Sequence, residues 1–244
     1  MIVLLNKRAV CLVIICIFLF SLAFGGLIFF FSQPDDLIPV TSNQSPLAEK
    51  KMVIDPGHGG IDGGSSYDDL LEKEINLTLA RQLKKYLSSQ GVEVTMTRTK
   101  DQALDHLNNK YESRHRRDLQ ARVDIIAAEQ PELFISLHVN YFAGSSSLRG
   151  PICFYQADNK ESKQLAQLVQ EELNGLEAET DKLPDNSSRP GDYFILNNCQ
   201  VPGILIEMGF LNQPADRKLL TNDQLQQKLV QSIYQGLLKF YESD

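Results

Sequence analysis

The chain has 244 residues, a net charge of −7 and an apolar content of 43%. These values are typical of one globular domain with appendages, and they exclude a wholly disordered, collagen-like or low-complexity chain. Proteins that bind phosphate backbones use clustered Lys and Arg, so the acidic balance also argues against a nucleic-acid partner.

The N-terminal segment from residue 9 to 31 is almost wholly apolar and long enough for a helix that crosses the hydrocarbon core of a bilayer. Two basic residues precede it and two acidic residues follow it, so the positive-inside rule places the rest of the chain outside the cytoplasmic membrane. A cleaved secretory signal is the alternative, with a small-x-small site at residues 21–23. Residues 1–31 are therefore expected to be a signal anchor or a signal peptide. The anchor is favoured because the apolar run continues beyond Ala23.

Residues 32–50 contain three prolines among Ser, Asn, Gln and Asp, which is the composition of a flexible linker. From residue 51 to 244, strand-like and helix-like patterns alternate. The expected elements are a strand at 51–55, a helix with apolar residues every four positions from 75 to 87, a strand at 92–98, a helix at 118–128, strands at 133–137 and 151–155, a helix at 165–173, a buried strand at 203–206 and a closing helix at 225–240.

This alternation predicts an α/β fold: a single domain with a mainly parallel, twisted sheet covered by helices on both faces. Two stretches interrupt it, one at 102–117 that is rich in charge and histidine, and one at 177–192 that is rich in Ser, Asn, Asp and Pro. Both are expected to be exposed loops near the carboxyl edge of the sheet. The first could contact an anionic glycan or act as a flap, but a solvated charged surface is the favoured interpretation.

Four polar side chains fall at the carboxyl edge of the predicted sheet, where open α/β sheets bind their ligands. His58, His138 and Glu207 directly follow three of the expected strands. Glu72 begins the first long helix, whose N-terminus should point to the same edge. The sequence therefore predicts that these four residues converge.

Two His and one Glu are common protein ligands of hydrolytic zinc sites, in which a water occupies the fourth position. We therefore assign His58, Glu72 and His138 as candidate Zn²⁺ ligands. Glu207 is the candidate catalytic residue, because a further carboxylate can take the proton of the attacking water and deliver it to the leaving nitrogen. Each residue alone also fits a packed His, an acid favoured by the helix dipole or a strand-end cap. Their shared edge favours the metal site.

Other hydrolase mechanisms fit the sequence less well, since it contains neither a G-x-S-x-G elbow nor an H-E-x-x-H helix. The glycines of GHGGIDGG match neither the dinucleotide nor the Walker pattern. Cys153 and Cys199 lie in apolar contexts. Two buried thiols are expected there, although a disulfide between them stays open.

Five segments in this order resemble the zinc-dependent N-acetylmuramoyl-L-alanine amidases of the bacterial cell wall: MVIDPGHGGIDGG, LLEKEINLTLARQL, VTMTR, LFISLHVN and ILIEMGFLNQ. In that family the His of GHGG, the Glu before K-x-x-N-L and the His of S-x-H-x-N bind zinc, and the Glu of I-E-x-G-F is the catalytic acid/base. The resemblance implies these roles for His58, Glu72, His138 and Glu207. It also implies hydrolysis of the amide that joins N-acetylmuramic acid to L-alanine in peptidoglycan.

The long 102–117 stretch and the N-terminal segment look like the germination-specific amidases of spore-forming bacteria, which act on cortex peptidoglycan. That resemblance implies a location at the outer face of the membrane, in the cell wall or in the spore cortex space. Gln213 departs from the family, where Asn is commoner. Two alternatives stay open: a zinc peptidase that trims the stem peptide, and a non-catalytic wall-binding regulator. Whether a protein partner is needed also stays open.

Overall fold

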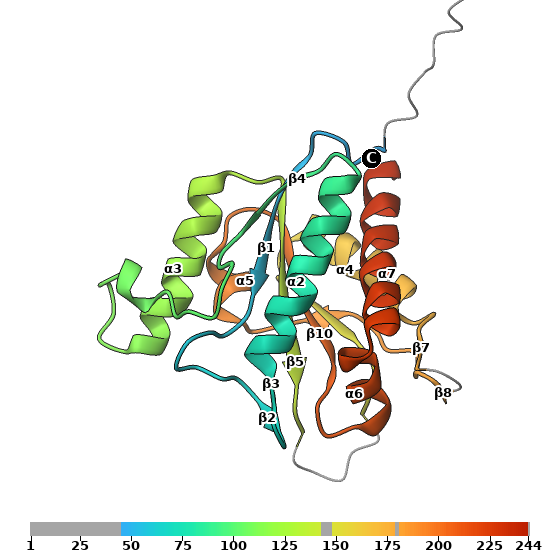
Figure 1. Ribbon diagram of the computed structural model, residues 1–244. Helices are drawn as coiled ribbons and strands as arrows, with labels where there is room; N and C mark the ends of the chain where they lie inside the picture. The colour runs from blue at the N-terminus through green and yellow to red at the C-terminus, as the bar shows by residue number, and fades with distance from the viewer. Residues whose placement is uncertain (1–44, 143–147, 179–180, 244) are drawn as a thin grey trace, which may run out of the picture. The chain divides into compact units, whose positions relative to one another are not determined.

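The computed structural model describes residues 45–142, 148–178 and 181–243 (Figure 1). The apolar N-terminal segment and most of the expected linker lie outside these residues. Within the described ranges, no helix is long and apolar enough to cross a membrane. The residues from 44 onward form one compact unit.

That unit is built on a six-stranded, mainly parallel sheet with the strand order β4-β1-β5-β10-β6-β9. The strands β4, β1, β5 and β10 all run parallel, β6 is antiparallel to β10, and β9 is parallel to β6. Their bounds are β1 (Lys51–Pro56), β4 (Glu93–Met96), β5 (Leu133–Asn140), β6 (Ile152–Tyr155), β9 (Arg189–Pro190) and β10 (Gly203–Phe210). The predicted α/β fold with a mainly parallel sheet is confirmed.

Helices cover both faces of the sheet. Because alternate residues of a strand point to opposite faces, each central strand contributes side chains to two cores. Met52 and Ile54 of β1 pack into the larger core, whereas Val53 packs into a second, smaller one. The larger core contains residues of α2 (Glu72–Ser89), α4 (Lys160–Leu173), α6 (Pro214–Thr221) and α7 (Asp223–Glu242), and the smaller one contains residues of α3 (Arg114–Glu129) and α5 (Phe194–Asn198). The near-continuous apolar strands of the sequence follow from this double coverage.

The expected linker ended at residue 50, but the described residues 45–50 pack onto the domain. Leu47 is fully buried in the larger core. The backbone N–H of Glu49 donates to the carbonyl of Gly91 at 2.9 Å. The folded unit therefore begins before Lys51. A single buried leucine among polar residues has no periodicity, so the sequence pattern does not reveal it.

The loop expected at 102–117 ends at residue 113, because α3 begins at Arg114 rather than at residue 118. Ser113 caps the helix by accepting a hydrogen bond from the backbone N–H of Arg116. A short 3₁₀ helix, η1 (Asp105–Leu107), lies within the remaining loop. Three of the first four α3 residues are Arg, which the helix dipole disfavours at an N-terminus. Composition therefore concealed the true start of α3.

The 177–192 stretch is mainly irregular, but it contains one short strand pair and the edge strand β9. β7 (Glu177–Ala178) pairs with β8 (Asp181–Lys182), and β2 (Ser66–Tyr67) pairs with β3 (Leu70–Leu71) just before α2. Cys153 and Cys199 are buried free thiols, as expected. Burial raises the pKa of Cys199 to about 12, which makes it a poor nucleophile at neutral pH.

Candidate active site

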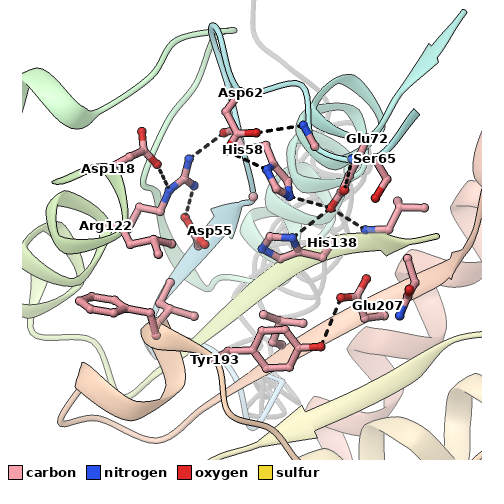
Figure 2. Close-up of a pocket in the computed structure, with 18 of the residues that line it drawn as sticks. Asp55, His58, Asp62, Ser65, Glu72, Asp118, Arg122, His138, Tyr193 and Glu207 are labelled. Atoms are coloured by element: carbon pink, nitrogen blue, oxygen red, sulfur yellow. Dashed lines mark hydrogen bonds and ion pairs between the residues drawn. The ribbon is translucent and has the colours of Figure 1, made fainter. Parts of the chain in front are cut away.

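The predicted convergence of four polar residues is found at the carboxyl edge of the sheet. His58 follows β1, His138 lies near the end of β5, and Glu207 lies on β10 directly opposite His138. Glu72 is the first residue of α2. Figure 2 shows all four side chains around one pocket.

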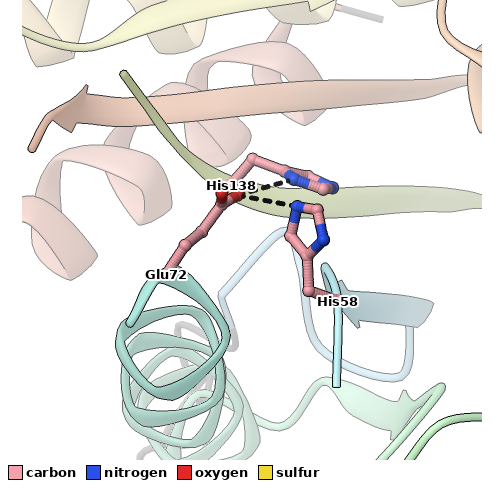
Figure 3. A group of neighbouring side chains, drawn as sticks. All are labelled: His58, Glu72 and His138. Atoms are coloured by element: carbon pink, nitrogen blue, oxygen red, sulfur yellow. Dashed lines mark hydrogen bonds and ion pairs between the residues drawn. The ribbon is translucent and has the colours of Figure 1, made fainter. Parts of the chain in front are cut away.

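His58, Glu72 and His138 form a tight cluster (Figure 3). Oε1 of Glu72 lies 3.1 Å from Nε2 of His58 and 3.0 Å from Nδ1 of His138. One possible ligand atom from each residue lies within 4.8 Å of the others. Two imidazole nitrogens and one carboxylate oxygen at this spacing fit the donor set of a zinc site. The three residues predicted as metal ligands are thus brought together.

The start of α2 holds Glu72 in place. The first N–H groups of a helix lack partners within it, and here those of Glu72 and Lys73 donate to the carbonyls of Ser65 and Gly63. The Glu72 carboxylate accepts the backbone N–H groups of Ser65 at 2.8 Å and Val139 at 3.1 Å. Burial opposes its charge, but the hydrogen bonds and charges of the two histidines prevail and lower the pKa of Glu72. It is therefore a carboxylate at neutral pH, as a metal ligand must be.

His58 has a left-handed backbone with φ of 59°, a conformation that costs free energy for a residue other than glycine. Its Nδ1 lies 3.0 Å from Oδ2 of Asp62. Burial lowers the pKa of His58, yet Glu72 and Asp62 together raise it to about 9. If His58 held a metal ion, its imidazole would first have to lose this proton. A carboxylate behind a ligating imidazole is also the usual means of fixing its orientation.

Two glycines of GHGGIDGG make room for the candidate ligands. A Cβ on Gly57 would lie 2.2 Å from the Cε1 atom of His138. Gly64 has φ of 67°, and a Cβ there would lie 2.6 Å from Oε2 of Glu72. Both distances are far below a van der Waals contact. Gly57 and Gly64 thus allow close packing against the side chains of two candidate ligands.

Gly57→Ala is expected to displace the His138 ring and to weaken zinc binding by at least about tenfold, the lower bound for losing a partner that orients a ligand. Zinc titration of the purified protein measures the effect. Gly63→Ala is the matched control, because its Cβ would meet only Leu71 at an ordinary 3.8 Å. Unchanged zinc affinity in Gly57→Ala would show that the ring position does not matter.

Glu207 lies across the pocket from the cluster, with only 7% of its surface exposed. Its Oε1 accepts a 3.5 Å hydrogen bond from the Tyr193 hydroxyl, and its buried Oε2 has no hydrogen-bond partner among the described residues. Burial raises the pKa of Glu207 to about 7. The charge of His138 opposes this shift, and the smaller contribution of Glu72 adds to it. A carboxyl group with such a pKa can both accept and donate a proton near neutral pH.

The four residues line a cavity of about 620 Å³. Tyr193, Phe194 and Ile195 form part of its wall and give it an apolar side. His115 also lines the cavity. Its Nδ1 lies 3.8 Å from Oδ2 of Asp62. A cavity of this size accommodates a ligand larger than a single amino acid.

Several residues around the site were missed by sequence reasoning. Asp62 lies four positions after His58, a spacing that could have marked it as the partner of the imidazole. Tyr193 directly follows the 177–192 stretch, outside every expected element. The remaining three are buried polar residues: Asp55, Arg98 and Arg122.

Comparisons with known proteins agree with this geometry. The family model described as N-acetylmuramoyl-L-alanine amidase matches residues 52–239. A protein of Bacillus subtilis (strain 168) named germination-specific N-acetylmuramoyl-L-alanine amidase is 38% identical over 198 residues, which are 80% of this chain and 81% of that protein.

Solved structures agree as well. The CwlD amidase from Clostridioides difficile, in complex with the GerS lipoprotein, is similar with a TM-score of 0.72 and 34% identity, over 80% of this chain and 100% of that one. An N-acetylmuramoyl-L-alanine amidase from Clostridium difficile 630 is similar with a TM-score of 0.68 and 28% identity, over 80% and 98% of the two chains.

The family match extends from β1 to α7 and so includes every strand of the large sheet and all four residues of the site. The resemblance carried by the five sequence motifs is confirmed. The chain belongs to the N-acetylmuramoyl-L-alanine amidase family and is an enzyme that acts on peptidoglycan.

Proposed function

We propose that this amidase is zinc-dependent and that His58, Glu72 and His138 hold the metal while Glu207 is the catalytic residue. The main support is the cluster itself, in which one carboxylate oxygen lies about equally far from two imidazole nitrogens, 3.1 and 3.0 Å. Glu207 lies directly opposite His138 on the neighbouring strand, with one buried oxygen that accepts no hydrogen bond from the part of the chain that the structure describes. The bond cleaved is the amide between the lactyl group of N-acetylmuramic acid and L-alanine.

Zinc in such a site supplies Lewis-acid chemistry, acidifying water and polarising a carbonyl. Within residues 45–142, 148–178 and 181–243, no donor bonds Glu207 Oε2, so this oxygen is available to take a proton from the attacking water. As the C–N bond breaks, Glu207 returns that proton to the nitrogen of L-alanine, which leaves as a free amine. The Tyr193 hydroxyl holds Oε1 and so restricts the rotation of the carboxyl group.

Removal of the metal with a chelator is expected to abolish hydrolysis, and added Zn²⁺ should restore it. Mass spectrometry of the products should show an intact stem peptide with L-alanine at its new N-terminus. A peptide cut elsewhere would instead identify a stem-peptide peptidase. Activity that persists without metal would contradict zinc dependence.

Glycans from vegetative walls and from spore cortex, digested in parallel, show whether the cortex is the preferred substrate.

A role in the spore cortex during germination is part of the proposal. It is supported by the 38% identity to a protein named for germination and by the similarity to the CwlD amidase.

We further propose that residues 1–31 export the enzyme, either as a membrane anchor or as a signal, so that it acts in the wall or cortex space. Determination of the N-terminus of the mature protein distinguishes an anchor from a cleaved signal.

The CwlD structure contains a lipoprotein, so a protein partner of that kind is also proposed, and copurification tests it.

A further inference from the structure

Two buried arginines, Arg98 and Arg122, bond the backbone segments that carry candidate metal ligands. Each side chain is almost wholly inaccessible to solvent, with the residues 1% and 2% exposed. Burial of a guanidinium is costly unless its N–H groups find acceptors. The acceptors they find belong mostly to the backbone next to the ligands.

Arg98 connects the loop that carries His58 to the helix that carries Glu72. Its Nε donates to the carbonyl of Pro56 at 2.9 Å, and one terminal nitrogen donates to the carbonyls of Gly57 at 2.8 Å and Lys73 at 2.9 Å. Gly57 immediately precedes His58, and Lys73 immediately follows Glu72. One rigid guanidinium therefore sets the spacing of two ligand-bearing segments.

Arg122 holds the same loop from α3. Its terminal nitrogens donate to the carbonyls of His58 and Pro56, each at 2.7 Å. Its charge is balanced by Asp55 and Asp118, each also at 2.7 Å (Figure 2). Because His58 has a left-handed backbone, the bond to its own carbonyl acts on the residue whose conformation most needs support.

Asp55 extends this network to the third ligand. Its Oδ2 accepts the hydroxyl of Ser136 at 2.7 Å, two residues before His138 on β5. Its Oδ1 accepts the hydroxyl of Thr97 at 2.5 Å. Arg122, Asp55 and Ser136 thus connect the segment of His58 to the strand of His138.

We propose that Arg98 and Arg122 are positioning residues that hold the three ligand segments in a metal-binding arrangement. The inference rests on the proposed zinc site. A merely structural role would be served as well by apolar side chains, since buried ion pairs add little net stability. The bonds concentrate instead on residues adjacent to His58, Glu72 and His138. They fix the backbone, so the ligands need little rearrangement when the metal binds.

The test uses Arg98→Lys and Arg122→Lys, which keep the positive charge but lose the planar fork that bonds several carbonyls at once. Gln226→Leu is the control for general destabilisation. Gln226 is buried and donates to the carbonyl of Leu220 at 2.6 Å, between α6 and α7. Zinc affinity is measured by competition with a chromophoric chelator, the coordination geometry from the visible spectrum of the Co²⁺-loaded protein, and folding from the melting temperature of the metal-free protein.

Both lysine variants are expected to bind zinc about 10- to 100-fold more weakly, the range found for residues that support metal ligands, and to alter the Co²⁺ spectrum. Gln226→Leu should lower the melting temperature and leave both metal readouts unchanged. Parental zinc affinity and an unchanged spectrum in folded lysine variants would overturn the inference. If the parent chain itself binds no zinc, the proposed function fails instead. Should Arg122→Lys not fold, Arg98→Lys and Ser136→Ala decide the matter by the same readouts.

Discussion

Glu207→Gln is expected to lower kcat by about 10²- to 10⁴-fold, the usual contribution of a general acid–base group, with zinc still bound at one ion per chain. Glutamine preserves the shape of the side chain and can still accept a hydrogen bond from Tyr193. It has no basic oxygen with which to take a proton from water. Single-turnover hydrolysis of a defined muropeptide and metal analysis of the same preparation measure the two quantities.

Glu74→Gln is the matched control for Glu207→Gln, because Glu74 is an exposed acid in the first turn of α2. It should keep full activity. If Glu207→Gln loses zinc together with activity, Glu207 is a metal ligand and its assignment as the catalytic residue is wrong.

His138→Ala and His58→Ala are each expected to weaken zinc binding by more than about 100-fold, because losing a ligand should exceed the 10- to 100-fold effect of losing a supporting residue. Hydrolysis should fall with metal occupancy. Equilibrium dialysis against buffered zinc measures the affinity, and the circular dichroism spectrum shows whether the fold persists.

His106→Ala controls for the loss of an imidazole, since His106 is exposed in η1 and lies outside the cluster. It should bind zinc as the parent does. Parental zinc affinity in both His58→Ala and His138→Ala would place the metal elsewhere and remove the basis for the proposed mechanism.

The fold and the convergence of four polar side chains were predictable because their signals are local. Apolar runs mark strands that are covered on both faces, and the carboxyl-edge rule then selects His58, His138 and Glu207. The antiparallel direction of β6 could not be predicted, because a strand has the same side-chain period in either direction. The start of α3 was missed because a capping serine was followed by arginines that suggested a loop.

The supporting residues were not predictable for a different reason. Arg98 and Arg122 act on carbonyl oxygens, which every residue has, so no side-chain pattern marks their partners. Their distance in sequence from those partners, 41 and 64 positions, also exceeds any local motif. Only the assembled sheet and helices bring them next to the segments that carry the candidate ligands.

The burial of Leu47 has a practical consequence for any shortened version of this enzyme. A fragment cut at Lys51, where the first strand starts, would leave a hole in the larger core and remove the backbone hydrogen bond from Glu49 to Gly91. Loss of a buried leucine side chain costs about 2–5 kcal/mol, a large share of the stability of a typical domain. A fragment for expression or crystallisation should therefore retain residues 45–50.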